Sequence, residues 1–132
     1  MTRTEARRNA MKLIYEWEFG GSGNNETIEG LLQVQAGEPE YDFMLRLFSD
    51  VTEQYRTLDS VVEKYCRGWS LDRLSKMDLA ILRIAICELQ RGEEATNVVI
   101  SEAVDMAEVY STDKAGSFIN GILGSYARDH SK

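Results

Sequence analysis

Apolar positions recur along the chain at steps of three and four residues, the spacing that places side chains on one face of an α-helix. No long stretch shows the period-two alternation that is typical of strands, and the chain contains one proline, Pro39. The pattern therefore predicts an all-α protein with about seven helices. The expected helices cover approximately residues 3–19, 28–36, 40–66, 71–74, 75–91, 99–107 and 118–126.

The longest apolar seam lies in the third predicted helix, over residues 40–66. Its steps alternate between four and three residues, so most of this helix must lie against other helices. Pro39 suits the first turn of the helix, where its missing N–H group is not needed. Residues 67–70 end it. The seam consists of Met44, Phe48, Val51, Tyr55, Leu58, Val62 and Tyr65.

Two helix ends carry recognisable signals. Ser75 and Asp78 form an S-x-x-D capping box, in which the hydroxyl and the carboxylate satisfy otherwise unpaired backbone N–H groups. Gly92 suits the left-handed residue that ends the same helix. The sequence therefore predicts a helix that starts near Ser75 and stops at Gly92.

The dipeptide Asn120-Gly121 is normally a hairpin signal, yet here it lies inside an apolar pattern of helical period. We interpret Gly121 and Gly124 as positions where the backbone of another helix approaches closely. Each glycine costs a helix about 1 kcal/mol relative to alanine. The alternative interpretation is that the last helix begins only after Gly121.

Length and charge narrow the class of protein. A chain of 132 residues with 43% apolar residues suits one domain, or two tightly fused halves, around a real core. The formal net charge is −7, but residues 1–12 carry +3, so the rest carries −10. A basic tip on an acidic body can bind a phosphate backbone locally. Four basic residues are also often a solvated helix face, so the charge pattern alone leaves both interpretations open.

Residue types that carry catalysis or bind metals are sparse. Cys66 and Cys87 lack CxxC or histidine neighbours, which indicates buried thiols of a reducing compartment. His130 stands in the C-terminal tail, so we expect no metal site and no cofactor. No Ser/His/Asp set, Cys/His set or phosphate loop is present, and we expect no enzyme activity. The absence of a bilayer-spanning apolar run and of a signal peptide predicts a cytoplasmic protein that does not enter membranes.

Four stretches of the sequence, at residues 6–18, 80–89, 99–107 and 117–123, are familiar in their order and spacing. Through them the chain resembles the NusB transcription antitermination family over nearly its whole length. The resemblance implies a single NusB-like domain over residues 1–132, built as two helical bundles packed side by side. The N-terminal bundle would cover about residues 1–66 and the C-terminal bundle about residues 70–130.

The resemblance also implies a function and a set of partners. NusB-like proteins bind boxA, a short single-stranded RNA element in ribosomal RNA leaders, together with NusE, a ribosomal small-subunit protein. The complex joins other Nus factors on RNA polymerase and promotes processive elongation. Whether the free protein is a monomer or a homodimer that hides the RNA face stays open, as do the NusE-binding residues and the preferred RNA sequence.

The basic N-terminal helix is the first candidate RNA contact. Arg3 and Arg7 are one i,i+4 pair, and Arg8 and Lys12 are another, so the cations spread over about half of the helix circumference. Guanidinium groups grip phosphates bidentately or stack on unpaired bases. Helix solubility is the alternative role, and the resemblance favours RNA contact for Arg7 and Arg8. The arm departs from the family, because Thr4 and Glu5 stand where further basic residues are common.

Phe118 is the second candidate, since an aromatic ring at a helix start can stack on a base. Its spacing alone favours a core residue, whereas the resemblance implies RNA contact. The preceding residues 113–117 depart from the family pattern, which leaves contacts from that loop in doubt.

The resemblance also assigns Tyr15, Asp78 and Arg83 to the RNA groove. Asp78 could accept a hydrogen bond from a base amino group as well as serve the capping box. For Arg83 an ion pair with a neighbouring acid is the alternative role.

Two rival functions follow from the same residues. The alternative function is a non-catalytic helical protein-interaction module with weak or lost RNA binding. It would also fit an N-terminal helix with fewer basic residues than is common in the family and the altered loop at residues 113–117. NusB-like domains also precede ribosomal RNA methyltransferases, but that arrangement requires a Rossmann-type domain with a glycine-rich cofactor turn, which this chain lacks. We therefore expect an RNA-binding antitermination factor.

Overall fold

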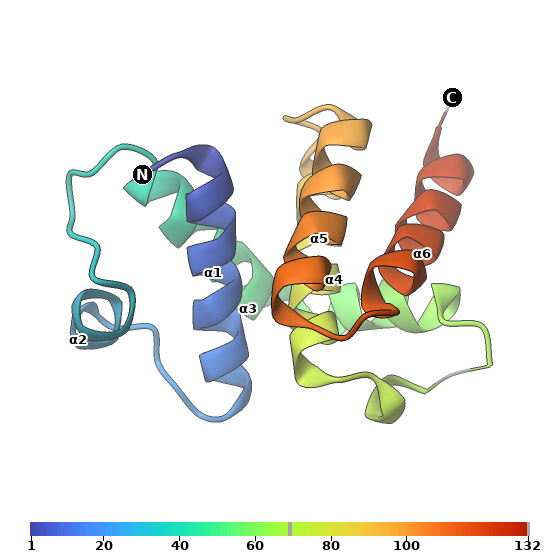
Figure 1. Cartoon of the computed structure of the whole chain (residues 1–132), viewed down its shortest axis with the longest axis horizontal. Coiled ribbons are helices and arrows are strands. Elements are labelled where there is room, and N and C mark those ends of the chain that lie inside the picture. Colours follow the sequence, from blue (N-terminus) through green and yellow to red (C-terminus); the bar gives the residue numbers. More distant parts are fainter. Residues whose placement is uncertain (69, 132) are drawn as a thin grey trace. The chain divides into compact units, whose positions relative to one another are not determined.

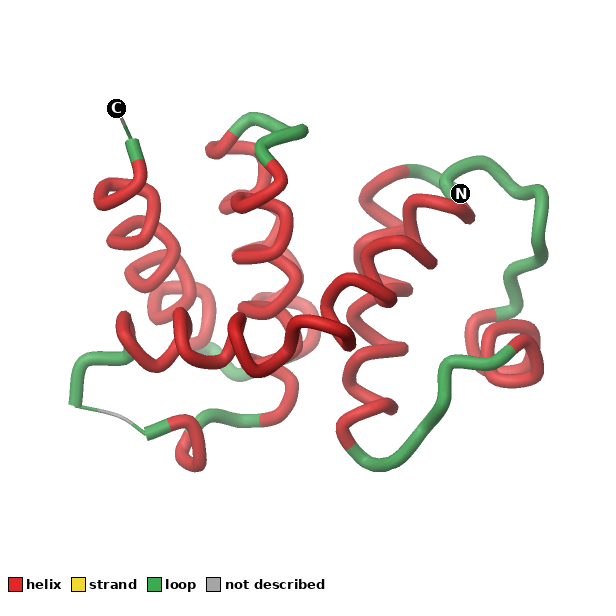
Figure 2. Tube along the Cα trace, turned by 180° about the vertical axis from the view of Figure 1, so that it is seen from behind, coloured by secondary structure: helices red, strands yellow, loops and turns green. Residues whose placement is uncertain are grey.

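A computed structural model describes residues 1–68 and 70–131. Within these residues the protein is all helical, with six α-helices, one π-helical turn and one 3₁₀ turn (Figure 1). Figure 2 shows only helices and loops in the described part of the chain. The elements are α1 (Arg3–Glu18), α2 (Asn25–Thr27), the π turn η1 (Ile28–Leu32), α3 (Tyr41–Tyr65), the 3₁₀ turn η2 (Leu71–Arg73), α4 (Lys76–Arg91), α5 (Thr96–Tyr110) and α6 (Ala115–His130).

The chain forms two compact units, Met1–Glu53 and Gln54–Lys132. The boundary between them falls inside α3. The first unit contains α1, α2 and η1, and the second contains η2, α4, α5 and α6. The predicted all-α class is confirmed. The described residues form six α-helices where about seven were expected, because the predicted segments 28–36 and 71–74 give a π turn and a 3₁₀ turn, and the short α2 precedes the first of these turns.

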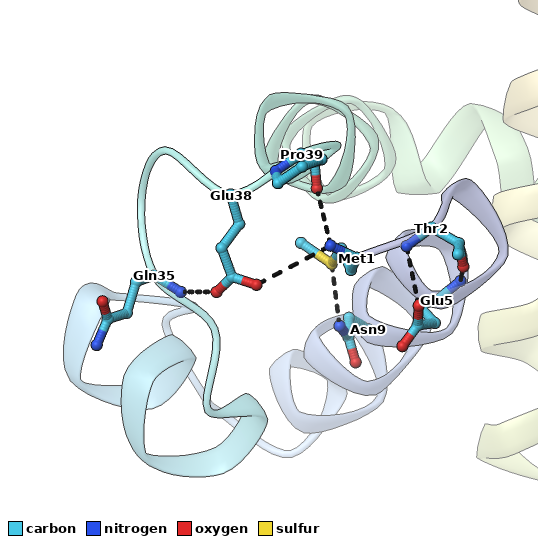
Figure 3. A network of polar contacts seen from close by, with 7 residues as sticks. All are labelled: Met1, Thr2, Glu5, Asn9, Gln35, Glu38 and Pro39. Atoms are coloured by element: carbon cyan, nitrogen blue, oxygen red, sulfur yellow. Dashed lines mark hydrogen bonds and ion pairs between the residues drawn. The ribbon is translucent and has the colours of Figure 1, made fainter.

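The start of α1 is fixed by a capping box and by a polar network (Figure 3). The Thr2 hydroxyl accepts from the Glu5 backbone N–H at 3.1 Å, and the Thr2 N–H donates to Glu5 Oε1 at 2.9 Å. The bond from the Thr2 backbone N–H to the carboxylate lowers the pKa of the Glu5 carboxyl. Met1 adds a bond from its amino group to the Pro39 carbonyl at 3.4 Å. Glu5 stands where basic residues are common in the family, and in this structure it has a structural role at the start of α1.

The core of the first unit is apolar and closely follows the predicted periodicity. Ala6, Ala10, Leu13 and Ile14 form the buried face of α1. From α3 and the segment before it come Ile28, Val34, Met44, Leu47 and Val51.

Pro39 does not open the third helix, so that prediction is wrong. Glu40 has a φ of +68°, in the left-handed region, and α3 begins only at Tyr41. A residue with positive φ cannot continue an α-helix. Pro39 therefore belongs to the loop before α3, where its carbonyl holds Met1.

In the second unit, α5 packs against both α4 and α6. The Ser75 hydroxyl caps α4 by accepting from the Asp78 N–H at 3.0 Å, and Gly92 ends the helix with a φ of +68°, as predicted. The side chains of Leu79 to Glu88 are all buried. Because α4 is covered around its circumference, it is the central element of this unit.

Gly121 and Gly124 of α6 do not have the role that we predicted for them. A Cβ atom at Gly121 would meet nothing within 4 Å, and one at Gly124 would meet only Nη1 of Arg128, one turn away, at 3.4 Å. No other helix backbone approaches these glycines, so the close-approach interpretation is wrong. The alternative that the helix begins after Gly121 is also wrong, because α6 starts at Ala115.

Both cysteines are free and buried, as predicted, and burial raises the pKa of the Cys66 thiol. Among the described residues, no three His, Cys, Asp or Glu side chains gather in a way that could hold a metal ion. None of the described helices combines the length and apolar character that crossing a bilayer requires.

Candidate nucleic-acid interface

The cations of α1 differ in how strongly their neighbours hold them. Arg3 Nε donates to Glu40 Oε2 at 2.6 Å, and its guanidinium lies 4.1 Å from the centre of the Phe43 ring. Arg7 lies 5.5 Å from the same ring and is 2% exposed. Phe43 thus holds both guanidinium groups by cation–π attraction. In this conformation Arg7 offers almost no surface to a ligand, whereas the exposed Arg3 shares its charge with Glu40.

Arg8 is the less constrained arginine of this helix. It is half-buried and forms no ion pair with any residue that the structure describes. Its Nε atom is buried without a hydrogen-bond partner. An unpaired buried donor is unfavourable by about 1–3 kcal/mol, so an anion that reoriented the guanidinium would relieve this cost. Lys12, one turn further, is also half-buried.

Tyr15 lies in the last turn of α1 with its ring partly in solvent. It is 36% exposed and makes an edge contact with Phe19, with ring centroids 5.1 Å apart. Phe19 itself is 64% exposed. Tyr15, a predicted site residue, thus belongs to an accessible aromatic pair that the sequence did not indicate.

Asp78 is placed by both its backbone and its side chain. Its N–H donates to Ser75, while its Oδ1 accepts from the Ser111 hydroxyl at 2.6 Å. The hydroxyl half of the predicted capping box therefore forms, and the carboxylate is held by the end of α5. This bond orients the carboxylate and leaves Oδ2 without a partner among the residues described.

A hollow of about 260 Å³ lies beside Asp78 in the second unit. The turn η2, the start of α4 and the start of α6 surround it. Asp78 contributes an anionic oxygen, Phe118 an aromatic ring, and Arg73 and Lys114 contribute cations. The side chains of Arg73 and Lys114 form no ion pair within residues 1–68 and 70–131. The hollow thus combines a stacking surface, an acceptor for amino groups and two phosphate-binding groups.

Phe118 occupies the first turn of α6 and is half-buried. Its N–H donates to the Lys114 carbonyl at 3.2 Å, so the helix itself positions the ring next to the lysine. The structure therefore brings together two of the predicted site residues, Asp78 and Phe118, although 40 positions separate them in the sequence.

Arg83 is held in a buried ion pair in the second unit. Its Nε and Nη2 donate to the two carboxylate oxygens of Asp59 at 2.7 and 2.8 Å, and the residue is 3% exposed. A bidentate pair of this kind fixes the guanidinium in one orientation. The ion-pair role left open by the sequence is therefore present, and RNA contact by Arg83 stays a prediction.

Sequence reasoning missed Arg73, Lys114 and Ser111. A usable signal existed for Lys114, because it stands four residues before Phe118 and therefore one helical turn away. Arg73 and Ser111 carried no such signal, since their place beside Asp78 depends on how three helices meet.

Comparisons with known proteins point to one family. The model of the NusB family matches residues 4–128 of the chain. The chain is similar to transcription antitermination protein NusB of Acetivibrio thermocellus, with 41% identity over 97% of this chain and 90% of the relative. It is also similar to a solved structure of T. maritima NusB, with a TM-score of 0.86 and 28% identity over 100% of this chain and 94% of that one. A chain in the crystal structure of a plectonemic RNA supercoil matches with a TM-score of 0.86 and 26% identity, over 98% of both chains.

Proposed function

The chain belongs to the NusB family, and from that premise we propose that it binds a boxA-like single-stranded RNA and promotes antitermination. Members of this family are antitermination factors and not enzymes. In the proposal, the RNA element lies in ribosomal RNA leaders and a NusE-like ribosomal protein binds with it. The complex then reaches RNA polymerase with other Nus factors, which places the protein in the cytoplasm.

The observation that carries the proposal is the hollow at Asp78 and Phe118. Unpaired bases are recognised by stacking on aromatic rings and by hydrogen bonds to their edges, because no partner strand covers them. Phe118 provides the ring, and Asp78 provides an acceptor whose orientation Ser111 fixes at 2.6 Å. Arg73 and Lys114 provide charge for the flanking phosphates.

These side chains would have two separate roles, base selection and phosphate binding. A base with an exocyclic amino group, such as adenine or cytosine, would donate to Asp78 Oδ2 while its ring stacks on Phe118. A base without that group would place a carbonyl against the carboxylate, which is unfavourable. The hollow would therefore select the base, and the cations would supply salt-dependent affinity.

The cations of α1 are the second part of the proposed interface. Arg8, Arg3 and Lys12 would bind phosphates of the same RNA, and Tyr15 would offer its exposed ring. That α1 and the head of α6 hold one strand stays a prediction. It is tested by shortening the RNA, because a strand that spans both features loses the effect of Arg8→Ala below a minimum length.

The test of the function is a titration of fluorescent boxA-like and scrambled RNAs, with and without the NusE-like partner. We expect tighter binding of the boxA-like RNA, and an affinity that falls steeply with salt. Equal and negligible binding of both RNAs in the presence of the partner would overturn the proposal. That outcome would favour the rival function, a protein-interaction module, which the engagement of Arg3 and Arg7 by Glu40 and Phe43 also supports.

A further inference from the structure

Phe118 lines a second hollow as well as the one at Asp78. This second hollow, of about 370 Å³, includes Tyr65, Arg67, Gly121 and Ser125 but not Asp78, Arg73 or Lys114. Its size is in the range of sites for small organic ligands. The Phe118 side chain is therefore shared by two adjacent recesses of the second unit, whereas the proposed function uses only one of them.

Gly121 lies in this second hollow and has no structural explanation within the chain. It stands in the middle of α6, where glycine destabilises a helix relative to alanine. Its φ is not positive, and a Cβ atom there would meet nothing within 4 Å. Neither backbone conformation nor internal packing requires a glycine. What its missing side chain leaves open is the surface of the hollow itself, where a ligand can approach the helix backbone.

The charges around the second hollow favour an anion. Arg67 is exposed, and its side chain forms no ion pair with the residues described. Arg128 Nη2 donates to the Ser125 hydroxyl at 3.1 Å, which places a second cation near the edge. The nearby carboxylate of Asp129 is engaged at 2.7 Å by the Tyr65 hydroxyl, and this bond raises the pKa of Tyr65, which stays neutral.

We propose that the second hollow holds the nucleotide next to the one bound at Asp78, so that Phe118 contacts two consecutive nucleotides. Gly121 lets the sugar–phosphate backbone pass close to α6, and Arg67 binds the phosphate. This inference rests on the proposed function, because it extends the same RNA strand by one position. A single-stranded nucleic acid fits the combination of an aromatic ring, an open glycine and a cation.

The test is Gly121→Ala, with Gly124→Ala as the matched control on the same helix. Both substitutions should raise Tm by roughly 3–5 °C, because alanine favours the helix. Only Gly121→Ala should weaken binding of the boxA-like RNA, by about tenfold, since its methyl group enters the hollow while that of Gly124 does not. Arg67→Ala should lower the salt slope of log Kd by about 0.7, the value for one phosphate contact on a single strand.

The outcomes separate this inference from the proposed function. If the wild-type protein binds no RNA, the proposed function is wrong, and the role inferred for the second hollow is wrong as well. If the wild type binds RNA and Phe118→Ala weakens it, while Gly121→Ala and Arg67→Ala bind like the wild type, the second hollow alone is wrong. Equal losses for Gly121→Ala and Gly124→Ala would also overturn it, because the effect would then not be local.

Discussion

The cations of α1 and those beside Phe118 carry the same charge but have different surroundings. In α1, Arg3 is paired with Glu40 and Arg7 is buried against Phe43. In the second unit, Arg73 and Lys114 line an open hollow, and their side chains have no ionic partner in the part of the chain that the structure describes. The region with the denser basic sequence thus has less charge available for a ligand.

This difference teaches that a basic sequence run is not equivalent to a basic surface. An arginine that is already neutralised by a carboxylate or desolvated on a ring releases fewer counterions when RNA binds. Arg73 and Lys114 share their hollow with the Asp78 carboxylate but form no ion pair among the described residues, so their charge stays available to a ligand. The comparison therefore predicts that the sparse cations of the second unit contribute more to RNA affinity than the dense cations of α1.

The largest effect is expected from Phe118→Ala. Loss of base stacking, which contributes about 1–3 kcal/mol per base, should weaken RNA binding roughly 5- to 150-fold. The salt slope should hardly change, because stacking releases few counterions. Affinity measured by fluorescence anisotropy at several salt concentrations checks both statements.

Leu31→Ala is the control, since Leu31 is an exposed apolar residue of the first unit that lies outside the proposed interface. We expect affinity within twofold of the wild type, as for a residue outside the hollow. A Phe118→Ala protein whose circular dichroism spectrum indicates unfolding would support a core role for the ring instead. Phe118→Tyr should then restore the fold and most of the affinity.

A smaller effect is expected when cations are removed in pairs. Arg73→Ala with Lys114→Ala should lower the salt slope by about 1.4 and weaken binding about tenfold, because two phosphate contacts are lost. Arg3→Ala with Arg7→Ala should lower the slope by less than half as much. A larger slope change for the α1 pair would reverse the comparison between the two regions.

The smallest effects separate Arg7 from Arg8. Arg7→Ala should lower the free energy of unfolding by about 1–2 kcal/mol, because packing and cation–π attraction to Phe43 are lost. Arg8→Ala should leave stability unchanged and lower the salt slope by about 0.7. Urea unfolding and salt titrations measure the two quantities. Equal stability losses for both variants would show that burial does not distinguish these arginines.

Much of the fold was predictable because it depends on local signals. Ser75 and Gly92 mark the two ends of α4 through backbone hydrogen bonds and a left-handed residue, both of which a sequence displays directly. The errors concern residues whose role depends on distant neighbours. Pro39 was misplaced, since Glu40 after it adopts a positive φ that no residue type in the sequence signals, and α3 begins only at Tyr41.

Less of the candidate site was predictable. The sequence and its resemblance identified Asp78 and Phe118, yet their common hollow depends on how η2, α4 and α6 meet, and the Asp78 carboxylate is oriented by Ser111, 33 positions away. The sequence could not show that Arg7 is buried, because an i,i+4 pattern gives the face of a helix and not what covers it. For Gly121 of α6 the error ran in the other direction, from a buried prediction to an open surface. Gly121 was assigned to internal packing, and the structure leaves its surface open.

The two buried thiols can report how often the second unit opens to solvent. Cys66 and Cys87 are the only cysteines of the chain, and both lie in the unit that begins at Gln54. A thiol reagent cannot reach them until that unit opens, and the raised pKa of Cys66 slows its reaction further. Alkylation rates therefore report local opening of the second unit without any engineered label, whereas the first unit, which has no cysteine, gives no signal.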